Sequence, residues 1–249
     1  MNSLSIVNYY NTTPFLFGIN RSQLKKQLNI QLDIPSVCAQ KLKAKQVDIG
    51  LVPVALLPEL KEYHIISDYC IGADGVVDSV KLFSHKLLHE ITHVLLDYQS
   101  KTSITLVQVL NTHFWKQSIQ FINASEGFEQ QIKDTTAAVI IGDRTFGITK
   151  EDYRYQYDLS EEWKKHTNLP FVFACWVSHK ELPADFINEF NDVLKDGITH
   201  IDEAIANKPI NIKGFDAEDY LKNKISYPLN EEKKKGLKLF LELMKNVGN

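Results

Sequence analysis

The sequence has no surplus of basic residues and no long hydrophobic run. Its 28 Lys and Arg residues stand against 31 Asp and Glu residues, a net charge of -3, so a broad basic surface for DNA or RNA is not expected. The longest apolar window, Leu169 to Val177, is about half of the roughly 20 residues that a membrane-spanning helix needs. The first residues, MNSLSIVNYYNTTP, lack the basic and apolar regions of a secretory signal. We therefore expect a soluble, cytoplasmic protein that binds neither nucleic acid nor membrane.

Cysteine is also scarce. The three cysteines, Cys38, Cys70 and Cys175, are an odd number, show no CxxC spacing and lie near apolar residues. A disulfide framework or a thiolate metal site needs paired cysteines at closer spacing. The sequence therefore predicts reduced thiols buried in the core.

What the sequence does contain is enough apolar material for a folded core. The chain has 249 residues, of which 44% are hydrophobic and 10% aromatic, so one or two domains are expected. Short β-type runs alternate with helical stretches over the first two thirds, which is typical of α/β folds. The predicted strands are Ser5 to Tyr9, Gln31 to Ile34, Val47 to Val52, Tyr63 to Ser67, Ser79 to Phe83, Val94 to Asp97, Ile119 to Ile122, Ala137 to Ile141 and Phe171 to Val177. A helix with one apolar face is predicted over Thr102 to Trp115.

After residue 180 the pattern becomes helical. Apolar residues keep a 3.6-residue period from about Pro183 to Ala206, which predicts one long amphipathic helix. A last helix follows Pro228, with Asn230 as its N-cap. The polar stretch between them, residues 207–229, could contain a short helix at residues 217–224.

The stretch from His89 to His93 reads HExxH. On a helix this motif would place two histidines on one face to bind zinc, with Glu90 as a base. The strands predicted on either side leave only about ten residues, less than a helix of ordinary length, about 11 residues. A solvated turn is therefore the preferred interpretation, and no metal is predicted.

Hydroxyl side chains gather where a predicted strand ends at Asp97 and a helix begins. Ser100, Thr102 and Ser103 lie in this stretch beside Lys101. The free N–H groups and positive dipole at a helix start favour anions. One hydroxyl would suffice as an N-cap. These side chains therefore either cap the helix in the ordinary way or form a site for a carboxylate or phosphate.

Polar residues also follow other predicted strands. The residues Asn8, Asn11, Thr12 and Thr13 lie at the end of the first strand, and Gly142 and Asp143 follow a later one. Ligands of open α/β sheets collect at the carboxyl ends of strands, although an ordinary turn would have the same composition. Gly72 and Gly75 are interpreted as turn residues before a strand from Val76 to Val80 that carries Ser79. Because no GxSxG surrounds Ser79, it is not expected to be a hydrolase nucleophile.

Eight stretches match a known family in the same order along the chain. They are residues 7–14 (VNYYNTTP), 35–39 (PSVCA), 47–54 (VDIGLVPV), 75–80 (GVVDSV), 96–97 with 100–103 (LD and SKTS), 141–143 (IGD), 157–159 (YDL) and 169–174 with Trp176 (LPFVFA and W). Together they resemble the menaquinone-biosynthesis family of the futalosine pathway, which contains chorismate dehydratase.

The resemblance implies an α/β, two-lobed periplasmic-binding-protein-like (type II) fold, with a cleft between the lobes and a helical C-terminal segment. Lobe one is expected to comprise residues 1–97 and 178–249, and lobe two residues 98–177. The two crossings between them would form the hinge.

The resemblance also implies an activity, the conversion of chorismate to 3-[(1-carboxyvinyl)oxy]benzoate and water, without a cofactor. Asn11 and Ser79 are expected at the reacting centre, where they would orient the substrate and hydrogen-bond the leaving hydroxyl. Neither is a strong base, so the enolpyruvyl carboxylate of the substrate is expected to take the proton. The residues expected to bind substrate are Ser100, Thr102 and Ser103, with Ser36 and Asp143 as weaker choices.

Two other functions fit the same fold. One is the sister enzyme that forms 1,4-dihydroxy-6-naphthoate, although NYYNTTP and VDSV look like the dehydratase branch. The other is a solute-binding protein that closes on a ligand without transforming it. A zinc peptidase is a distant third.

Overall fold

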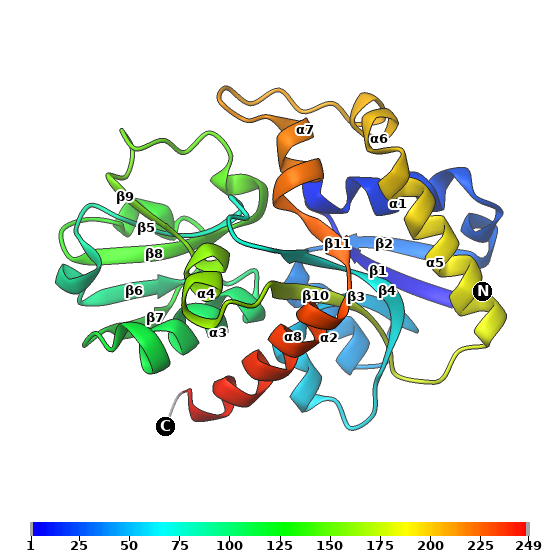
Figure 1. Ribbon diagram of the computed structural model, residues 1–249, viewed down its shortest axis with the longest axis horizontal. Coiled ribbons are helices and arrows are strands. Elements are labelled where there is room, and N and C mark those ends of the chain that lie inside the picture. Colours follow the sequence, from blue (N-terminus) through cyan, green and yellow to red (C-terminus); the bar gives the residue numbers. More distant parts are fainter. Residues whose placement is uncertain (1, 248–249) are drawn as a thin grey trace.

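The computed structural model describes residues 2–247, which form two β-sheets with helices packed around them (Figure 1). The first sheet has the strand order β11-β4-β10-β3-β1-β2. Its strands are β1 (Asn2–Val7), β2 (Leu28–Asp33), β3 (Ile49–Pro53), β4 (His64–Ala73), β10 (Phe171–Ser178) and β11 (Ser226–Pro228). The second sheet has the order β7-β6-β8-β5-β9. Its strands are β5 (Val80–Ser84), β6 (His93–Leu96), β7 (Gln120–Asn123), β8 (Thr136–Ile141) and β9 (Tyr155–Asp158).

Both sheets mix parallel and antiparallel pairs. In the first, β1 runs parallel to β2 and β3, whereas β10 runs antiparallel to β3 and β4. In the second, β6 is parallel to β7 and β8, whereas β5 is antiparallel to β8 and β9. The chain passes from the first sheet to the second between β4 and β5, and returns before β10.

The helices follow the same division. Those beside the first sheet are α1 (Thr13–Arg21), α2 (Pro35–Lys43), α5 (Ala184–Thr199) and α6 (Ile201–Asn207). Those beside the second are α3 (Lys101–Leu110) and α4 (Leu159–Thr167), and α7 (Ala217–Asp219) and α8 (Glu231–Leu243) come last. The short 3-10 turns include η1 (Tyr10–Thr12), η3 (Val54–Glu59), η4 (Leu88–Glu90) and η7 (Gly142–Thr145), and π turns follow α3 (η5, Asn111–Trp115) and α7 (η8, Tyr220–Lys224). Helix α8 contacts both β10 and α3, so it spans the junction between the sheets.

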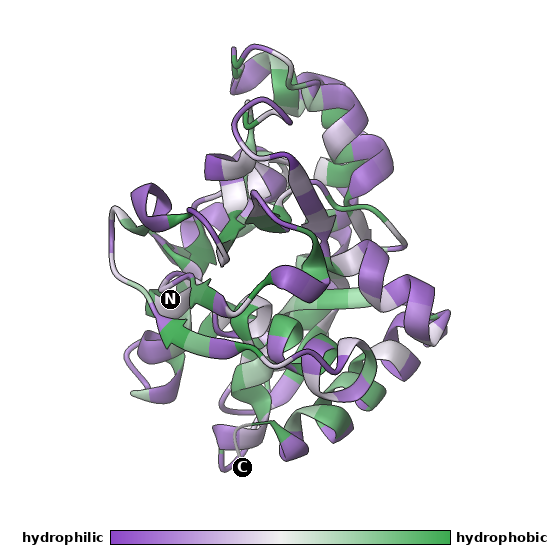
Figure 2. Cartoon of the chain, turned by 90° about the vertical axis from the view of Figure 1, so that its left-hand side faces the viewer, coloured by the Kyte–Doolittle hydropathy of each residue, from purple (hydrophilic) through white to green (hydrophobic). Residues whose placement is uncertain are grey.

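The hydrophobic pattern explains this arrangement. Every residue of β3 and β10 is buried, as expected for central strands covered on both faces. The helices carry alternating hydrophobic and hydrophilic bands, while the interior strands are largely hydrophobic (Figure 2). No helix within residues 2–247 has the length and hydrophobicity to cross a bilayer.

The nine strands first predicted between Ser5 and Val177 are all present, with displaced ends, and the helix over residues 102–115 is α3 continued by the π turn η5. The short helix at residues 217–224 is confirmed as α7 and η8. The long helix predicted to Ala206 is interrupted at His200, where the backbone departs from helical geometry and separates α5 from α6. The apolar residues keep the same helical period on both sides of His200, so the sequence pattern does not reveal this break.

Other details differ from the prediction. Gly72 is not a turn residue but lies inside β4, where a Cβ would stand 2.6 Å from the carbonyl oxygen of Phe171. The residues from Val76 to Ser79 are not a strand but the connection to β5. Strands β9 and β11 were not predicted, because β9 is short and polar and β11 has three residues, one of them Pro228.

The sheets also bear on the lobe boundaries predicted at residues 97 and 178. Strands β5 and β6, which precede residue 97, pair in the second sheet, and β10 pairs in the first. We infer that lobe two spans residues 80–167 and that lobe one comprises the rest, with crossings at residues 74–79 and 168–170. An apolar strand has the same composition in either sheet, so the sequence alone does not assign it.

The three cysteines are free and buried, as predicted. Burial raises the pKa of Cys38 to about 12 and that of Cys70 to about 11. We expect the native protein to resist iodoacetamide at neutral pH, because the thiolate is the reactive form. Mass spectrometry should show alkylation of all three thiols only after denaturation. Native alkylation as fast as that of free cysteine would contradict this.

Candidate functional site

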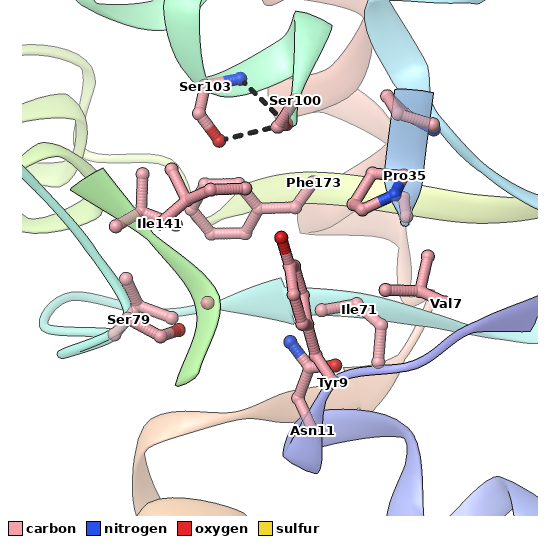
Figure 3. Close-up of a pocket in the computed structure, with 15 residues that line it drawn as sticks. Val7, Tyr9, Asn11, Pro35, Ile71, Ser79, Ser100, Ser103, Ile141 and Phe173 are labelled. Atoms are coloured by element: carbon pink, nitrogen blue, oxygen red, sulfur yellow. Dashed lines mark hydrogen bonds between the residues drawn. The ribbon is translucent and has the colours of Figure 1, made fainter. Parts of the chain in front are cut away.

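A cavity lies between the two sheets, at the ends of strands from both (Figure 3). Its lining consists of Val7, Tyr9, Asn11, Pro35, Pro53, Ile71, Val77, Ser79, Val80, Ser100, Ser103, Ile141, Gly142, Phe173 and Ala174. It encloses about 50 Å³, whereas small-molecule sites usually measure roughly 300–1,000 Å³. A substrate can therefore enter only if the lobes separate or a lining side chain moves.

Asn11 is held in this cavity by a tight turn between β1 and α1. The Thr12 hydroxyl donates to the carbonyl oxygen of Val7 at 2.7 Å, which folds the chain back after the strand. The Tyr227 hydroxyl donates to the backbone oxygen of Asn11 at 3.0 Å. Within residues 2–247, the buried Oδ1 of Asn11 has no hydrogen-bond partner. The residue is thus fixed by its backbone and retains a free acceptor.

Ser79 lies at the end of the first crossing, immediately before β5. The crossing is fixed by Asp158, whose carboxylate accepts the backbone N–H groups of Val77 at 3.0 Å and Asp78 at 2.7 Å. Asp78 has a left-handed φ of 63°, which turns the chain toward Ser79. The Tyr220 hydroxyl donates to Ser79 Oγ at 2.8 Å. Ser79 is almost fully buried, and its position is fixed by the crossing before it and by Tyr220.

The three hydroxyl side chains at the start of α3 do not all face the cavity. Ser100 is the N-cap and accepts from the Ser103 backbone N–H at 3.3 Å and the Ser103 hydroxyl at 3.1 Å. Both residues line the cavity (Figure 3). Thr102 does not, because successive helical residues point in different directions. Its hydroxyl accepts the backbone N–H of Ala55 at 3.1 Å and so ties α3 to η3.

Ser36 and Asp143 are outside the lining as well. The Ser36 backbone N–H donates to the carbonyl oxygen of Gln99 at 3.0 Å. Asp143 accepts the backbone N–H of Tyr10 at 2.9 Å. Both contacts join the two lobes beside the cavity, so these two residues, expected as weaker choices for binding substrate, do not line it.

Tyr9 was not singled out from the sequence, yet it stands in the middle of the cavity, between Asn11 and Phe173 (Figure 3). Its hydroxyl donates to the side-chain oxygen of Gln99, which belongs to the other lobe. Burial raises the pKa of Tyr9, so the hydroxyl stays protonated at neutral pH. Its ring lies against Gly142, where a Cβ would meet Tyr9 Cζ at 2.6 Å.

Gly142 provides a test of this packing. It has a φ of +67°, so Gly142→Ala adds both backbone strain and a collision with Tyr9. Gly127 has a φ of +84° and nothing near its Cβ position, so Gly127→Ala adds strain alone. We expect denaturant unfolding to show a loss of about 1 kcal/mol for Gly127→Ala and about 2–3 kcal/mol for Gly142→Ala. Equal losses would show that Tyr9 does not occupy this position.

None of the lining residues carries a charge. The nearby Arg144 guanidinium is paired with Asp97 and, at 2.7 Å, with Glu129. Helices α2 and α3 begin at the cavity with Pro35 and Ser100. Positive potential in the cavity therefore comes from helix starts and hydroxyl groups. This potential favours the binding of a carboxylate, but no single charged side chain sets where the carboxylate lies.

The HExxH stretch lies elsewhere and is not a helix. Glu90 ends the 3-10 turn η4, and His93 begins β6. The two histidines therefore do not share a helical face, and the prediction of a turn is confirmed. Among residues 2–247, no group of three or more His, Cys, Asp or Glu side chains is arranged to hold a metal ion.

Comparison with known proteins agrees with this architecture. The profile of a family described as menaquinone biosynthesis matches residues 2–246. A chorismate dehydratase of Thermus thermophilus is 24% identical over 239 residues, which cover 85% of this chain and 84% of that protein.

Solved structures show the fold. An Archaeoglobus fulgidus protein superposes with a TM-score of 0.76 at 13% identity, covering 98% of this chain and 96% of that one. A Candida albicans protein described as having the generic periplasmic binding protein fold has a TM-score of 0.63 at 15% identity, covering 100% and 91%. The aliphatic sulphonate binding protein of Escherichia coli has a TM-score of 0.60 at 14% identity, covering 100% and 94%. The predicted two-lobed, periplasmic-binding-protein-like fold is thus confirmed.

Proposed function

Since the chain belongs to the menaquinone-biosynthesis family, we propose that it is a chorismate dehydratase that forms 3-[(1-carboxyvinyl)oxy]benzoate and water. The observation that carries the proposal is that Asn11 and Ser79 line one cavity together with Ser100 and Ser103. The Thermus thermophilus relative named chorismate dehydratase supports the same reaction. A cytoplasmic location forms part of the proposal.

The reaction requires little from the protein beyond positioning. The hydrogen on ring carbon three is acidified through the ring double bond by the ring carboxylate. Its electron pair forms the new ring double bond as the neighbouring hydroxyl leaves, and the ring becomes aromatic. The enolpyruvyl carboxylate takes this proton, because no lining residue is a strong base at neutral pH. That proton and the departing hydroxide together make the water.

The site residues have matching roles in this proposal. The free Oδ1 of Asn11 accepts a hydrogen bond from the ring hydroxyl and orients it. The Ser79 hydroxyl donates to the same oxygen as negative charge develops on it. Ser100 and Ser103, at the start of α3, hold a carboxylate. Three other residues do not touch the substrate but hold the lobes and helices around the cavity: Ser36, Thr102 and Asp143.

Incubation with each candidate substrate separates the alternatives. We expect purified protein to convert chorismate to a product lighter by one water and to leave cyclised futalosine unchanged. Conversion of cyclised futalosine to 1,4-dihydroxy-6-naphthoate would favour the sister enzyme. Tight binding of either compound without turnover would favour a solute-binding protein.

A further inference from the structure

The stretch from Lys208 to Leu229, which links α6 to α8, sends two tyrosines toward the cavity. Tyr220 begins the π turn η8 and is 2% exposed, and Tyr227 lies in β11 with the same exposure. Their hydroxyls reach Ser79 Oγ at 2.8 Å and the Asn11 backbone oxygen at 3.0 Å. The C-terminal third of the chain therefore contacts both residues proposed for the reacting centre.

The direction of the Tyr220 hydrogen bond matters for Ser79. A serine hydroxyl has one hydrogen to donate and two lone pairs that accept. Because Tyr220 donates to Ser79 Oγ, the Ser79 hydrogen is left to point elsewhere, and the cavity is the side that Ser79 lines. A hydroxyl that accepts a hydrogen bond also becomes a stronger donor.

The surroundings keep Tyr220 in this role. Its ring packs edge-on against Phe146, with centroids 4.9 Å apart, and at a tilt against Phe215, with centroids 5.4 Å apart. Burial raises its pKa, so at neutral pH the phenol keeps the proton that it donates to Ser79 Oγ. Burial also raises the pKa of Tyr227, so its hydroxyl is protonated at neutral pH as well.

We propose that Tyr220 is a positioning residue for the dehydration, which orients the Ser79 hydroxyl so that its hydrogen points at the leaving oxygen of the substrate. This inference rests on the proposed function. It assigns a role to the C-terminal segment, which contains none of the eight matched stretches.

The test compares two tyrosines that differ in their hydrogen bonds. Tyr220→Phe removes the hydroxyl bound to Ser79 and keeps the ring. Tyr10→Phe removes an equally buried hydroxyl that has no hydrogen-bond partner within residues 2–247. We expect kcat for chorismate to fall by about 10- to 100-fold in Tyr220→Phe, with KM changed by less than about twofold, since a loss of 1.4 kcal/mol is tenfold. Tyr10→Phe should keep kcat within about twofold of the wild type.

A double-mutant cycle distinguishes positioning from a general structural effect. In a Ser79→Ala background, Tyr220→Phe should change kcat by less than about twofold, because the group it positions is gone. All rates are measured at a temperature at which circular dichroism shows every variant folded. An unchanged kcat in Tyr220→Phe, or the same loss in both backgrounds, would overturn the inference while wild-type turnover leaves the proposed function standing. Absence of turnover by the wild type would overturn both.

Discussion

Ser79→Ala is expected to lower kcat for chorismate dehydration by about 10²- to 10³-fold, the usual effect of losing one donor to a developing negative charge. Asn11→Ala is expected to lower kcat by about 10- to 100-fold, through the loss of one orienting hydrogen bond. Ser79→Ala removes the donor to the leaving oxygen, and Asn11→Ala removes the acceptor that orients it. Both side chains are small and line the cavity, so the fold should remain intact. Steady-state kinetics with chorismate, together with thermal unfolding, measures the effect.

Ser160→Ala is the matched control for Ser79→Ala. Ser160 is also fully buried, but its hydroxyl has no hydrogen-bond partner within residues 2–247 and it does not line the cavity. Its turnover should stay within about twofold of the wild type. Wild-type turnover in both Ser79→Ala and Asn11→Ala would show that the reaction takes place without them.

Asp158→Ala is expected to have the largest effect on stability. The carboxylate accepts four backbone N–H groups, from Val77 and Asp78 in the crossing and from Ser160 and Glu161 at the start of α4, at 2.7–3.1 Å. Its removal leaves these donors, of which those of Val77 and Ser160 are buried, without an acceptor and α4 without its cap. This should cost on the order of 3–5 kcal/mol of unfolding free energy. Turnover should fall as well, because the crossing leads directly into Ser79.

Asp216→Ala is the control that removes a helix cap without removing the hydrogen bonds to the crossing. Asp216 caps α7 by accepting the N–H groups of Glu218 and Asp219, but it is exposed, and within residues 2–247 no hydrogen bond joins its carboxylate to the crossing. Its loss should cost about 1 kcal/mol or less in denaturant unfolding. An unfolding free energy of Asp158→Ala no lower than that of Asp216→Ala would contradict the role given to Asp158.

The fold could be predicted from the sequence where hydrophobic periodicity decided it. Buried strands such as β10 and the apolar face of α3 produce strong patterns. The interruption of α5 at His200 and the polar strand β9 depend on tertiary contacts, which override local preference. The assignment of β5 and β6 to the second sheet depends on pairing, which local composition does not determine.

The candidate site was predicted in part. Asn11, Ser79, Ser100 and Ser103 do line one cavity, because polar residues at strand ends and helix starts converge between lobes. Thr102 is separated from Ser103 by a single helical step that turns it toward η3. Nothing in the sequence pointed to Tyr220, which is 141 residues from Ser79 and belongs to no matched motif. Such contacts arise only when the C-terminal segment folds back on the crossing that carries Ser79.

The most direct measurement of the central claim is the fate of chorismate with the purified wild-type protein and no added cofactor. Aromatic absorbance and mass should report 3-[(1-carboxyvinyl)oxy]benzoate, formed in equal amount to the chorismate consumed, at a rate proportional to protein concentration. Ser79→Ala at the same concentration should form it at least about 100-fold more slowly. Chorismate recovered intact from the wild-type reaction would contradict the account.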